Sequence, residues 1–559
     1  MDMNISSDDF VFLPLGGSGE IGMNANLYHY KGRWLMVDLG LSFPDESMPG
    51  VDVVLPDLQF IESRKDKLEA IILTHAHEDH FGAIQYLWKR LSVPVYGTAF
   101  TLALLRRKLA ESRLDYKIPL HEIDFNITYD FGPISVEIVQ LSHSVPDPAA
   151  LVLRSDEGTI LHTGDWKFDS TPMLGVDTDR ERLRQIGDEG VMALIGDSTN
   201  AMVDGYTPSE AVARQGLIDV IAEAEGLVAI TCFASNVARL ESIIAAAVAN
   251  NRSVCVVGRA LNRTIGAARD TGYLTDIPDF VSELEVSLIP RNNMVVICTG
   301  SQGETRAAMA KIAASIHETI ELQSGDTVIY SSRQIPGNEP AITKVHDMLV
   351  RRGIHLITDD DRPVHVSGHP ARDELVEMYG LVKPQIAIPV HGTARHLMAH
   401  AELAKNCQVK QTLIPNNGSA IRLKAGAADI IGQAPVGLLM PEGGEVVNLQ
   451  SDHLRSRRRM LWNGTVTATI VLSADGDLLM APQVSQSGLC PDHKSADFIA
   501  DSGLAIEDII CDQANQGDDD EAIEQMVRRT VRQMAKSHFK LRPTVHVHVM
   551  RTDIIGASV

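Results

Sequence analysis

Short apolar runs separated by turn-forming residues make up most of the first two hundred positions of the chain. FVFLPL at 10–15, AIIL at 70–73 and ISVEIVQL at 134–141 have the length and the β-branched or aromatic content of strands. Several such runs are followed closely by a histidine or an aspartate. The pattern predicts a mainly β segment over residues 1–206, with polar side chains gathered where its strands end.

The pattern changes in the middle of the chain. Strands such as LVAIT at 227–231 alternate with helical patterns such as VARLESIIAAAV at 237–248. This alternation is typical of a parallel sheet with crossover helices, so we expect an α/β domain over residues 207–365. The strand IAIPV at 386–390 returns to the first pattern. We infer that the α/β domain is inserted into the first domain, which residues 366–445 complete.

The last part of the chain shows a third arrangement. Residues 446–460 follow the turn-forming PEGGE and carry the basic run HLRSRRRM, and we interpret them as a linker. A small α/β domain follows over residues 461–559, with a strand at GTVTATIVL and a final strand at TVHVHVM. Between these strands an amphipathic helix carries one apolar face, made of Ile523, Met526, Val527, Thr530, Val531 and Met534.

Composition and charge restrict the possible functions. The formal net charge of −23 argues against a broad basic face for nucleic acid, because that mode of binding needs Lys and Arg to neutralise phosphates. Attraction for a polyanion must therefore be local. No apolar run is long enough to cross a bilayer, and the first residues are acidic where a signal peptide is basic and then apolar. We expect a cytoplasmic protein without membrane contact.

The strongest chemical signal is THAHEDH at 74–80, between the strand AIIL and the helix-like FGAIQYLWKR. A regular helix would scatter these side chains around its axis, whereas a turn between strand and helix can direct them to one point. Imidazole and carboxylate ligands suit zinc, or manganese where oxygen ligands contribute more. The motif therefore predicts a metal site with four potential ligands, His75, His77, Asp79 and His80.

Three further positions fit the same plan, since His143, Asp165 and His391 each follow a predicted strand. Strand ends on one edge of a sheet converge. In this order, HxHxDH, a later histidine, the aspartate of GD and the histidine of PVHG resemble the metallo-β-lactamase superfamily. The resemblance implies an αββα sandwich that binds two divalent ions. By it, one ion is held by His75, His77 and His143, the other by Asp79, His80 and His391, and Asp165 bridges them.

The middle block narrows this resemblance. GDSTNA at 196–201, FASNVAR at 233–239, CTGSQGE at 298–304 and HVSGHP at 365–370 resemble the β-CASP group of nucleases. Over nearly the whole chain, the order and wording of the motifs are similar to the ribonuclease J family. The expected fold is a metallo-β-lactamase αββα sandwich with an inserted β-CASP parallel α/β domain and a small C-terminal α/β domain. The implied chemistry is phosphodiester hydrolysis, with zinc as the first expectation for the metal and manganese as the alternative.

The resemblance also implies roles beyond metal binding. In the catalytic set, which includes Asp79, His369 is the general acid for the leaving 3′ oxygen and Asp197 assists it. A pocket for a 5′ monophosphate is implied at Ser235, His365 and Ser367.

Strand-end loops suggest two more phosphate contacts. Asn236 and Arg259 each open a helix after a strand, where backbone N–H groups favour an anion, although such residues also serve as simple helix caps. One departure from the family pattern matters. The helix start that commonly reads SNVHR is SNVAR here, so Ala238 stands where the family has a histidine. We therefore expect modest selection for a 5′ monophosphate.

Two other patterns resemble sites that we exclude. The glycines of GSGEIG at 17–22 match GxGxxG, but a hairpin pattern follows where a dinucleotide site needs a helix. His546 and His548 form an HxH pair, but they alternate with valines and so lie on one face of a strand.

The sequence thus predicts a 5′-to-3′ exoribonuclease with endoribonuclease activity on single-stranded RNA, acting in RNA processing and decay. By the resemblance, it forms a homodimer or homotetramer through the C-terminal domain, and other RNA-decay proteins are potential partners. Two alternatives are open. A hydrolase of small substrates such as thioesters or lactams would use the same metal site but leaves residues 207–365 unexplained. An inactive RNA-binding scaffold would not need all seven metal ligands.

Overall fold

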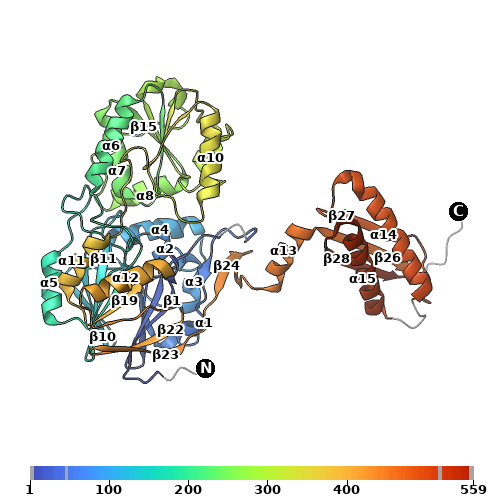
Figure 1. Ribbon diagram of the computed structural model, residues 1–559, viewed down its shortest axis with the longest axis horizontal. Helices are drawn as coiled ribbons and strands as arrows, with labels where there is room; N and C mark the ends of the chain where they lie inside the picture. Colours follow the sequence, from blue (N-terminus) through green and yellow to red (C-terminus); the bar gives the residue numbers. More distant parts are fainter. Residues whose placement is uncertain (1–4, 45–47, 514–518, 553–559) are drawn as a thin grey trace. The chain divides into compact units, whose positions relative to one another are not determined.

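Two mixed β-sheets pack face to face in the first lobe, as Figure 1 shows for the computed structural model, which describes residues 5–44, 48–513 and 519–552. The first sheet has eight strands in the order β23-β22-β1-β3-β4-β6-β7-β8. They are β1 (Phe10–Gly16), β3 (Ala25–Tyr30), β4 (Arg33–Val37), β6 (Leu68–Ile72), β7 (Val95–Gly97), β8 (Leu120–Glu122), β22 (Ser419–Lys424) and β23 (Ala427–Gln433).

The second sheet has seven strands in the order β21-β19-β13-β12-β11-β10-β9. They are β9 (Thr128–Phe131), β10 (Ile134–Gln140), β11 (Ala149–Ser155), β12 (Gly158–His162), β13 (Ala193–Asp197), β19 (Ile386–Val390) and β21 (Gln411–Thr412). Shorter pairings accompany the two sheets. They involve β2 (Ser18–Gly19) with β20 (Gly392–Thr393), and β5 (Leu55–Pro56) with β24 (Leu438–Glu442) and β25 (Glu445–Asn448).

Apolar side chains fill the space between the two sheets, and helices cover their outer faces. Phe10 and Phe12 of β1 meet Ile138 and Leu151 of the second sheet in one core. Because both faces of β1 are covered, all of its residues are buried. The covering helices are α1 (Gln59–Glu62), α3 (Ile84–Leu91) and α4 (Ala99–Ser112) on the first sheet, and α5 (Arg180–Glu189), α11 (Arg372–Val382) and α12 (Ala394–Asn406) on the second. The predicted αββα sandwich is confirmed.

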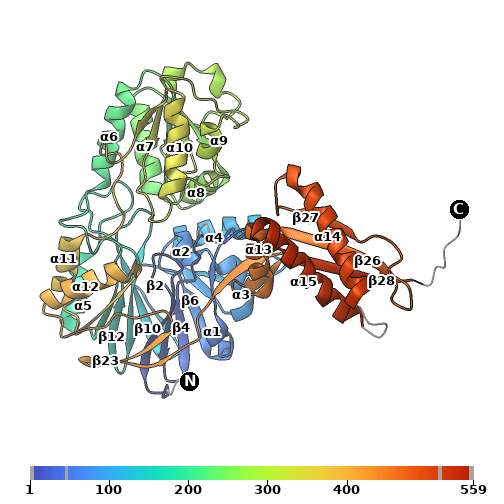
Figure 2. The ribbon, with the colours of Figure 1, turned by 45° about the vertical axis from the view of Figure 1, so that its right-hand side comes forward.

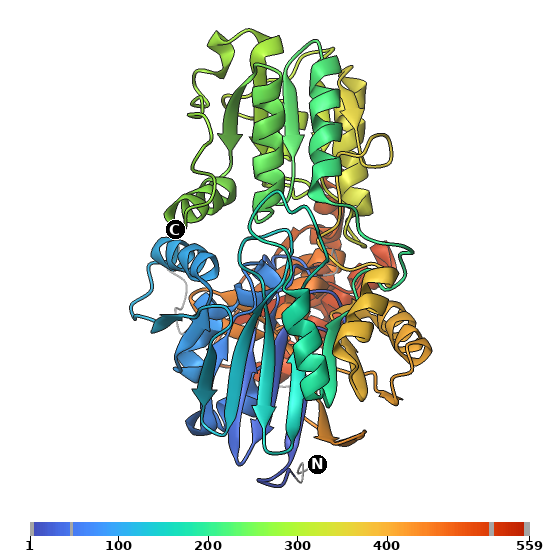
Figure 3. The same cartoon turned by 90° about the vertical axis from the view of Figure 1, so that its left-hand side faces the viewer.

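The second lobe is built on a parallel sheet in the order β15-β16-β14-β17-β18, with helices on both faces (Figure 3). Its strands are β14 (Val228–Thr231), β15 (Ser253–Val257), β16 (Met294–Cys298), β17 (Thr327–Tyr330) and β18 (His355–Ile357). Its helices are α6 (Glu210–Glu223), α7 (Val237–Ala249), α8 (Arg259–Asp270), α9 (Ala308–Ala313) and α10 (Glu339–Arg351).

In the sequence, the second lobe lies between β13 and β19. These two strands pair in parallel in the second large sheet. The lobe is therefore an insertion, as expected. The exact boundaries 206/207 and 365/366 stay predictions, because both lobes belong to one compact unit, Met1–Phe43 with Val53–Val446.

The small domain belongs to the other compact unit and places two helices on one face of a three-stranded sheet (Figure 2). Burial alternates along the central strand, whose inward residues pack with Phe498 and Val527. Its elements are α13 (Asp452–Asn463), β26 (Thr465–Leu472), β27 (Gln483–Ser487), α14 (Asp492–Gln513), α15 (Asp520–Phe539) and β28 (Thr544–Arg551). Helix α14 was not anticipated from the sequence, whereas α15 is the predicted amphipathic helix.

Part of the predicted linker over residues 446–460 is helical, which the sequence interpretation did not anticipate. Helix α13 starts after Ser451 and runs through the basic stretch, because no glycine or proline interrupts residues 452–463 and Asp452 lies favourably in the first turn. None of the helices in the described ranges is long and apolar enough to cross a membrane.

The core of the small domain predicts a local loss of stability. Replacing Phe498, whose side chain is 0% exposed, by alanine removes the aromatic group between the helices and the sheet. We expect the free energy of unfolding of this domain to fall by about 3–5 kcal/mol. Hydrogen exchange of the full-length chain should show lost protection in β26 but not in β1. Leu504→Ala is the matched control on the same helix, since Leu504 is 62% exposed. Equal protection in the two variants would contradict this packing role.

Candidate metal centre

The HxHxDH motif spans the turn that follows strand β6 and the first three residues of the short helix α2 (Glu78–Phe81). His75 and His80 are fully enclosed, while His77 and Asp79 are half-buried. His77 is the N-cap of this helix and has an extended backbone, so the motif changes from extended to helical conformation at this residue. This turn directs the ligand side chains towards the edge where the strands of both large sheets end.

Three histidines meet around one point. His75 Nε2 and His143 Nε2 lie 3.1 and 3.2 Å from His77 Nδ1. The same two nitrogens lie 3.6 and 3.9 Å from Asp165 Oδ2. The ligand atoms of these four residues all lie within 4.8 Å of one another, which is close enough to hold a metal ion.

A second group shares the same aspartate. His80 Nε2 is 3.3 Å from Asp165 Oδ2 and 3.6 Å from Asp79 Oδ2. His391 donates from Nδ1 to Asp165 Oδ1 at 2.7 Å, and its Nε2 lies 3.3 Å from Asp79 Oδ2. These four residues also offer ligand atoms within 4.8 Å of one another. Asp165 is thus common to both groups, and all seven residues named from the sequence lie together.

His369 and Asp197 form a pair next to these groups. His369 Nδ1 donates to Asp197 Oδ2 at 2.7 Å and lies 3.8 Å from Asp165 Oδ2. Burial lowers the pKa of His369, but the charges of Asp197 and Asp165 outweigh burial and leave the pKa above its usual value. Asp197, His369, Asp165 and His391 make a third set of possible ligands, so the geometry alone does not separate a proton donor from a ligand here.

Residues behind the ligands fix their orientation. His80 Nδ1 donates to Asp38 Oδ2 at 2.7 Å, which leaves Nε2 facing Asp79 and Asp165. Asp38 is held in turn by the amide and hydroxyl of Thr74. On the other side, His143 Nδ1 donates to the Gly368 carbonyl at 2.6 Å. Metal-binding histidines commonly use one nitrogen in this way, because it sets the tautomer and the ring angle.

The protonation of the cluster suits a cation. Burial lowers the pKa of His75, His77 and His143, to about 4 for His77, so these rings are neutral at pH 7 and keep a free lone pair. Burial also acts on His391, but the charge of Asp165 outweighs it and raises the pKa of His391 to about 10. Asp165 stays ionised, since nearby histidines outweigh burial and keep its pKa low. A divalent ion would take over the charge of the protons held here.

His391 supplies a direct test of the fit. Its Nε2 is buried and makes no hydrogen bond of good geometry among the described residues, while Asp79 Oδ2 of the same group lies 3.3 Å away, so one ion could take both atoms as ligands. The residue has a left-handed backbone with φ of 51°, which costs energy for any residue with a side chain. Its amide donates to the Gly17 carbonyl at 2.7 Å, which fixes this conformation. The glycine-rich loop that resembled a nucleotide motif therefore supports the metal cluster.

The residues predicted for phosphate binding are only partly brought together. Ser367 and Ala238 line one cavity with His143 and Lys167, whereas Ser235, His365 and Arg259 do not line it. Asn236 is the N-cap of α7, and its side chain accepts from the amide of Arg239. The amides of residues 236, 237 and 238 donate to Phe233, Ser235 and Ser144. A phosphate at this helix start would therefore depend on side chains.

Arg239 is a buried residue that the sequence reasoning missed. Its guanidinium makes two hydrogen bonds to Glu210, at 2.7 and 3.0 Å, and also donates to His365 Nδ1 at 2.9 Å. Because arginine is always protonated, His365 Nδ1 must accept, so the proton of His365 resides on Nε2. Burial and the charge of Arg239 lower the pKa of His365, which is therefore neutral. An arginine within the apolar run of α7 was the available signal.

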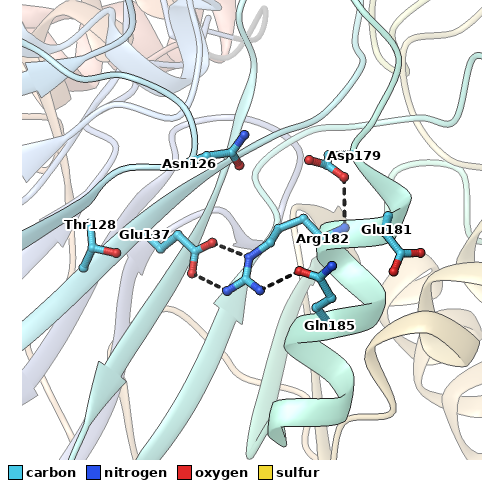
Figure 4. A pocket seen from close by; sticks show the side chains of 7 residues that line it. All are labelled: Asn126, Thr128, Glu137, Asp179, Glu181, Arg182 and Gln185. Carbon is cyan, nitrogen blue, oxygen red and sulfur yellow. Dashed lines mark hydrogen bonds and ion pairs between the residues drawn. The ribbon is translucent and has the colours of Figure 1, made fainter.

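A separate hollow of about 520 Å³ lies beside β10 and α5, away from these clusters (Figure 4). Its cation, Arg182, makes two hydrogen bonds to the Glu137 carboxylate, at 2.6 and 3.0 Å. The residues that line it are Asn126, Thr128, Glu137, Asp179, Glu181, Arg182 and Gln185. Arg182 and Glu137 already neutralise each other, and none of the predicted site residues lines this hollow. We therefore assign it no catalytic or binding function.

Comparison with known proteins identifies the family. Residues 19–198 match the family described as "Metallo-beta-lactamase superfamily", and residues 225–349 match "Ribonuclease J, beta-CASP domain". Residues 362–415 match "Zn-dependent metallo-hydrolase RNA specificity domain", and residues 453–552 match "Ribonuclease J C-terminal domain". A ribonuclease J of Sinorhizobium meliloti is 44% identical over 97% of this chain and 98% of its own length. The chain belongs to the ribonuclease J family.

Other comparisons agree with membership of the ribonuclease J family. A ribonuclease J of Mycolicibacterium smegmatis is 39% identical over 95% of this chain and 95% of its own length. A crystal structure of a protein of unknown function from Enterococcus faecalis V583 matches 74% of this chain and 100% of its own, with a TM-score of 0.53 and 18% identity, so it shares the fold. As a ribonuclease J family member, the chain is a metal-dependent ribonuclease, and the metallo-β-lactamase superfamily binds divalent metal.

The position of Asp38 predicts an effect on metal affinity. Asp38→Ala removes the acceptor that orients His80, so we expect metal to bind about 10–100-fold more weakly, as is typical when such a supporting residue is lost. Competition with a chromophoric chelator measures this affinity directly. Asp156→Ala is the control, because Asp156 lies on the surface of the same lobe. Unchanged affinity in Asp38→Ala would show that His80 needs no such support.

Proposed function

We propose that this ribonuclease degrades single-stranded RNA from the 5′ end and also cuts it internally, in RNA processing and decay. The observation that carries the proposal is the convergence of two ligand groups on Asp165 beside the His369–Asp197 pair. The two proposed metal ions are zinc, with manganese as the alternative. His75, His77 and His143 would hold one ion and Asp79, His80 and His391 the other, with Asp165 common to both ligand groups.

The residues of the chain have distinct tasks in this chemistry. When bound, two divalent ions supply the activation of water and the neutralisation of phosphate charge that phosphodiester hydrolysis needs. Asp38 and the Gly368 carbonyl hold the rings of His80 and His143 at fixed angles. The backbone carbonyl of His369 accepts from Asn200 and Thr207, at 3.0 and 2.7 Å, so this residue is fixed against the cluster.

His369 is proposed to donate the proton that the leaving 3′ oxygen takes up. Its Nδ1 is committed to Asp197, so the proton comes from Nε2, and the Asp197 carboxylate stabilises the charged ring before transfer. No serine or cysteine nucleophile is needed. Asp197 acts through His369 and is therefore a positioning residue.

The 5′ phosphate is proposed to bind at the edge of the same site. Ser367 accepts from Asn200 Nδ2 and from the amide of His369, at 2.8 and 3.2 Å, which leaves its hydroxyl hydrogen free to donate. His365, held by Arg239, offers Nε2–H, and Ser235, Asn236 and Arg259 complete the proposed set. A serine that contacts both the terminal phosphate and the His369 segment would link end recognition to cleavage.

The wider setting is proposed from the same family membership. The chain acts in the cytoplasm, forms a homodimer or homotetramer through its C-terminal domain, and works beside other RNA-decay proteins. The domain boundaries at 206/207, 365/366, 445/446 and 460/461 are proposed with it. Truncation near Arg457 tests the assembly role, because it should lower the number of chains per particle, which is the sedimentation mass divided by the mass of one truncated chain.

The proposed function is tested with labelled single-stranded RNA, double-stranded DNA and a chromogenic lactam as substrates. We expect the metal-loaded protein to cleave only the RNA and Asp79→Ala to lose cleavage while it keeps its fold, since Asp79 is a ligand at a strand-end turn. Glu181→Ala, at an exposed site on α5, is the control. Lactam hydrolysis without RNA cleavage would support the small-substrate alternative, and no cleavage at all would support the scaffold.

Loss of the proposed proton donor has a defined cost. For His369→Ala we expect RNA to bind normally while the single-turnover rate falls by about 10²–10⁴, the usual contribution of a general acid. Asp197→Asn should lower the rate less, since the ring remains but loses its negative partner. An unchanged rate in His369→Ala would remove this residue from the mechanism.

Ala238 predicts weak discrimination between 5′ ends. It lines a cavity with Ser367, so Ala238→His would add one charge-assisted hydrogen bond near a bound phosphate, worth about 1.5–3 kcal/mol. We expect kcat/KM for a 5′ monophosphate, relative to a triphosphate or hydroxyl end, to rise by roughly 10-fold or more. Internal cleavage should hardly change. Ala238→Gln serves as an uncharged comparison. Strong selectivity in the unmodified protein, with no gain in Ala238→His, would mean that the other residues suffice.

A further inference from the structure

Charge is strongly segregated within the small C-terminal domain. Residues 453–474 contain four Arg and no Asp or Glu, and residues 525–552 contain seven Lys or Arg and again no acid. Helix α14, in contrast, carries six Asp or Glu and a single Lys, Lys494. In a chain of net charge −23, two acid-free basic segments in one small domain are a marked departure from the average.

The fold joins these two basic segments into one surface. The amide of Arg542 donates to the side chain of Asn463 at the end of α13, at 3.0 Å, and α13 packs against β28. Arg528 and Arg532 are one helical turn apart on α15. Burial and then the like charges of Arg528 and Arg459 lower the pKa of Arg532, so the cations of α13 and α15 act on each other.

The side chains of this surface are available for a partner. Arg459, Arg532 and Arg542 are exposed, and none of them has an acidic partner in the described part of the chain. On the same face of α13 as Arg459, three residues along, lies Trp462, which is 76% exposed. Its neighbour Leu461 is 59% exposed. An exposed tryptophan one helical turn from an unpaired arginine is unusual, because burying such a ring is ordinarily favourable.

We propose that the basic surface formed by Arg459, Trp462, Arg532 and Arg542 binds single-stranded RNA outside the metal site. Arginines neutralise backbone phosphates, and a tryptophan face stacks on a base of any sequence. The surface would supply the local attraction that the acidic chain otherwise lacks. It rests on the proposed RNA-degrading function only in its choice of ligand.

A second copy of the chain is the competing occupant. In a two-fold dimer this surface could meet itself, which would place arginine against arginine, or it could meet the acidic α14 of the other copy. Contact with α14 would satisfy the arginines but would offer carboxylates to the exposed tryptophan ring, whereas a nucleic acid strand offers both phosphates and bases. Sedimentation of the variants distinguishes the two occupants.

The test separates long from short RNA on the full-length, metal-loaded protein. For Trp462→Ala and Arg532→Glu we expect KM on a 40-nucleotide single strand to rise about fivefold or more, since stacking and phosphate contacts are lost. Both kcat and the cleavage of a six-nucleotide RNA should stay unchanged. The dependence of log KM on log salt should weaken by about 0.7 for a lost phosphate contact. Lys494→Glu, with the same charge change on α14, is the matched control.

Three results would overturn the proposal. They are an unchanged KM on the long RNA, an equal rise in Lys494→Glu, and a fall in sedimentation mass in Trp462→Ala, which would make the surface a subunit contact. Arg532→Gln controls for a folding or repulsion defect caused by reversing the charge in Arg532→Glu. It must also raise KM on the long RNA, by a smaller factor. Failure of the proposed function is distinguishable, because the unmodified protein would then not cleave even the six-nucleotide RNA.

Discussion

The carboxylate of Asp165 is the point on which the first lobe converges. Two groups of histidines approach it from strands of both large sheets, and the pair His369–Asp197 lies beside it. So many ionisable groups would be costly to bury without opposite charge, since each desolvated charge needs a partner. Only the edge where several strands end can bring together the seven proposed ligands and the His369–Asp197 pair, which come from six parts of the chain. The αββα framework, its left-handed His391 and its supporting aspartate all serve this requirement.

Much of this arrangement could be predicted from the sequence. The spacing of apolar residues and the residue composition predict the strands. Because the ends of neighbouring strands share one edge of a sheet, His143, Asp165 and His391 are then expected near HxHxDH. Asp38 follows the same rule at the end of β4, yet it was missed because no motif marks it. The limits are physical. The ring of His143 is oriented by a hydrogen bond to the Gly368 carbonyl, 225 residues away in the sequence. No sequence pattern indicates such a contact.

The phosphate-binding residues show a similar limit. The sequence marks Ser235 and Asn236 at a helix start, but it cannot show that the amides there already have acceptors within the protein. Nor does it show that Arg239 fixes the tautomer of His365. Helix α13 was misjudged for a different reason. Four arginines in a short stretch suggest a solvated connection, although nothing in residues 452–463 opposes helix formation. Local propensity was the better guide there than composition.

The insertion of the second lobe between β13 and β19 has a consequence for the order of synthesis. The ribosome makes six of the seven proposed ligands within the first 165 residues, but His391, which contacts Asp165, comes 226 residues later. The second ligand group is therefore incomplete until the whole inserted lobe has left the ribosome. A nascent chain that ends before His391 contains the three histidines of the first ligand group but lacks one residue of the second group. If these seven residues are the ligands, nuclease chemistry cannot begin before the ribosome has translated the inserted lobe and reached His391.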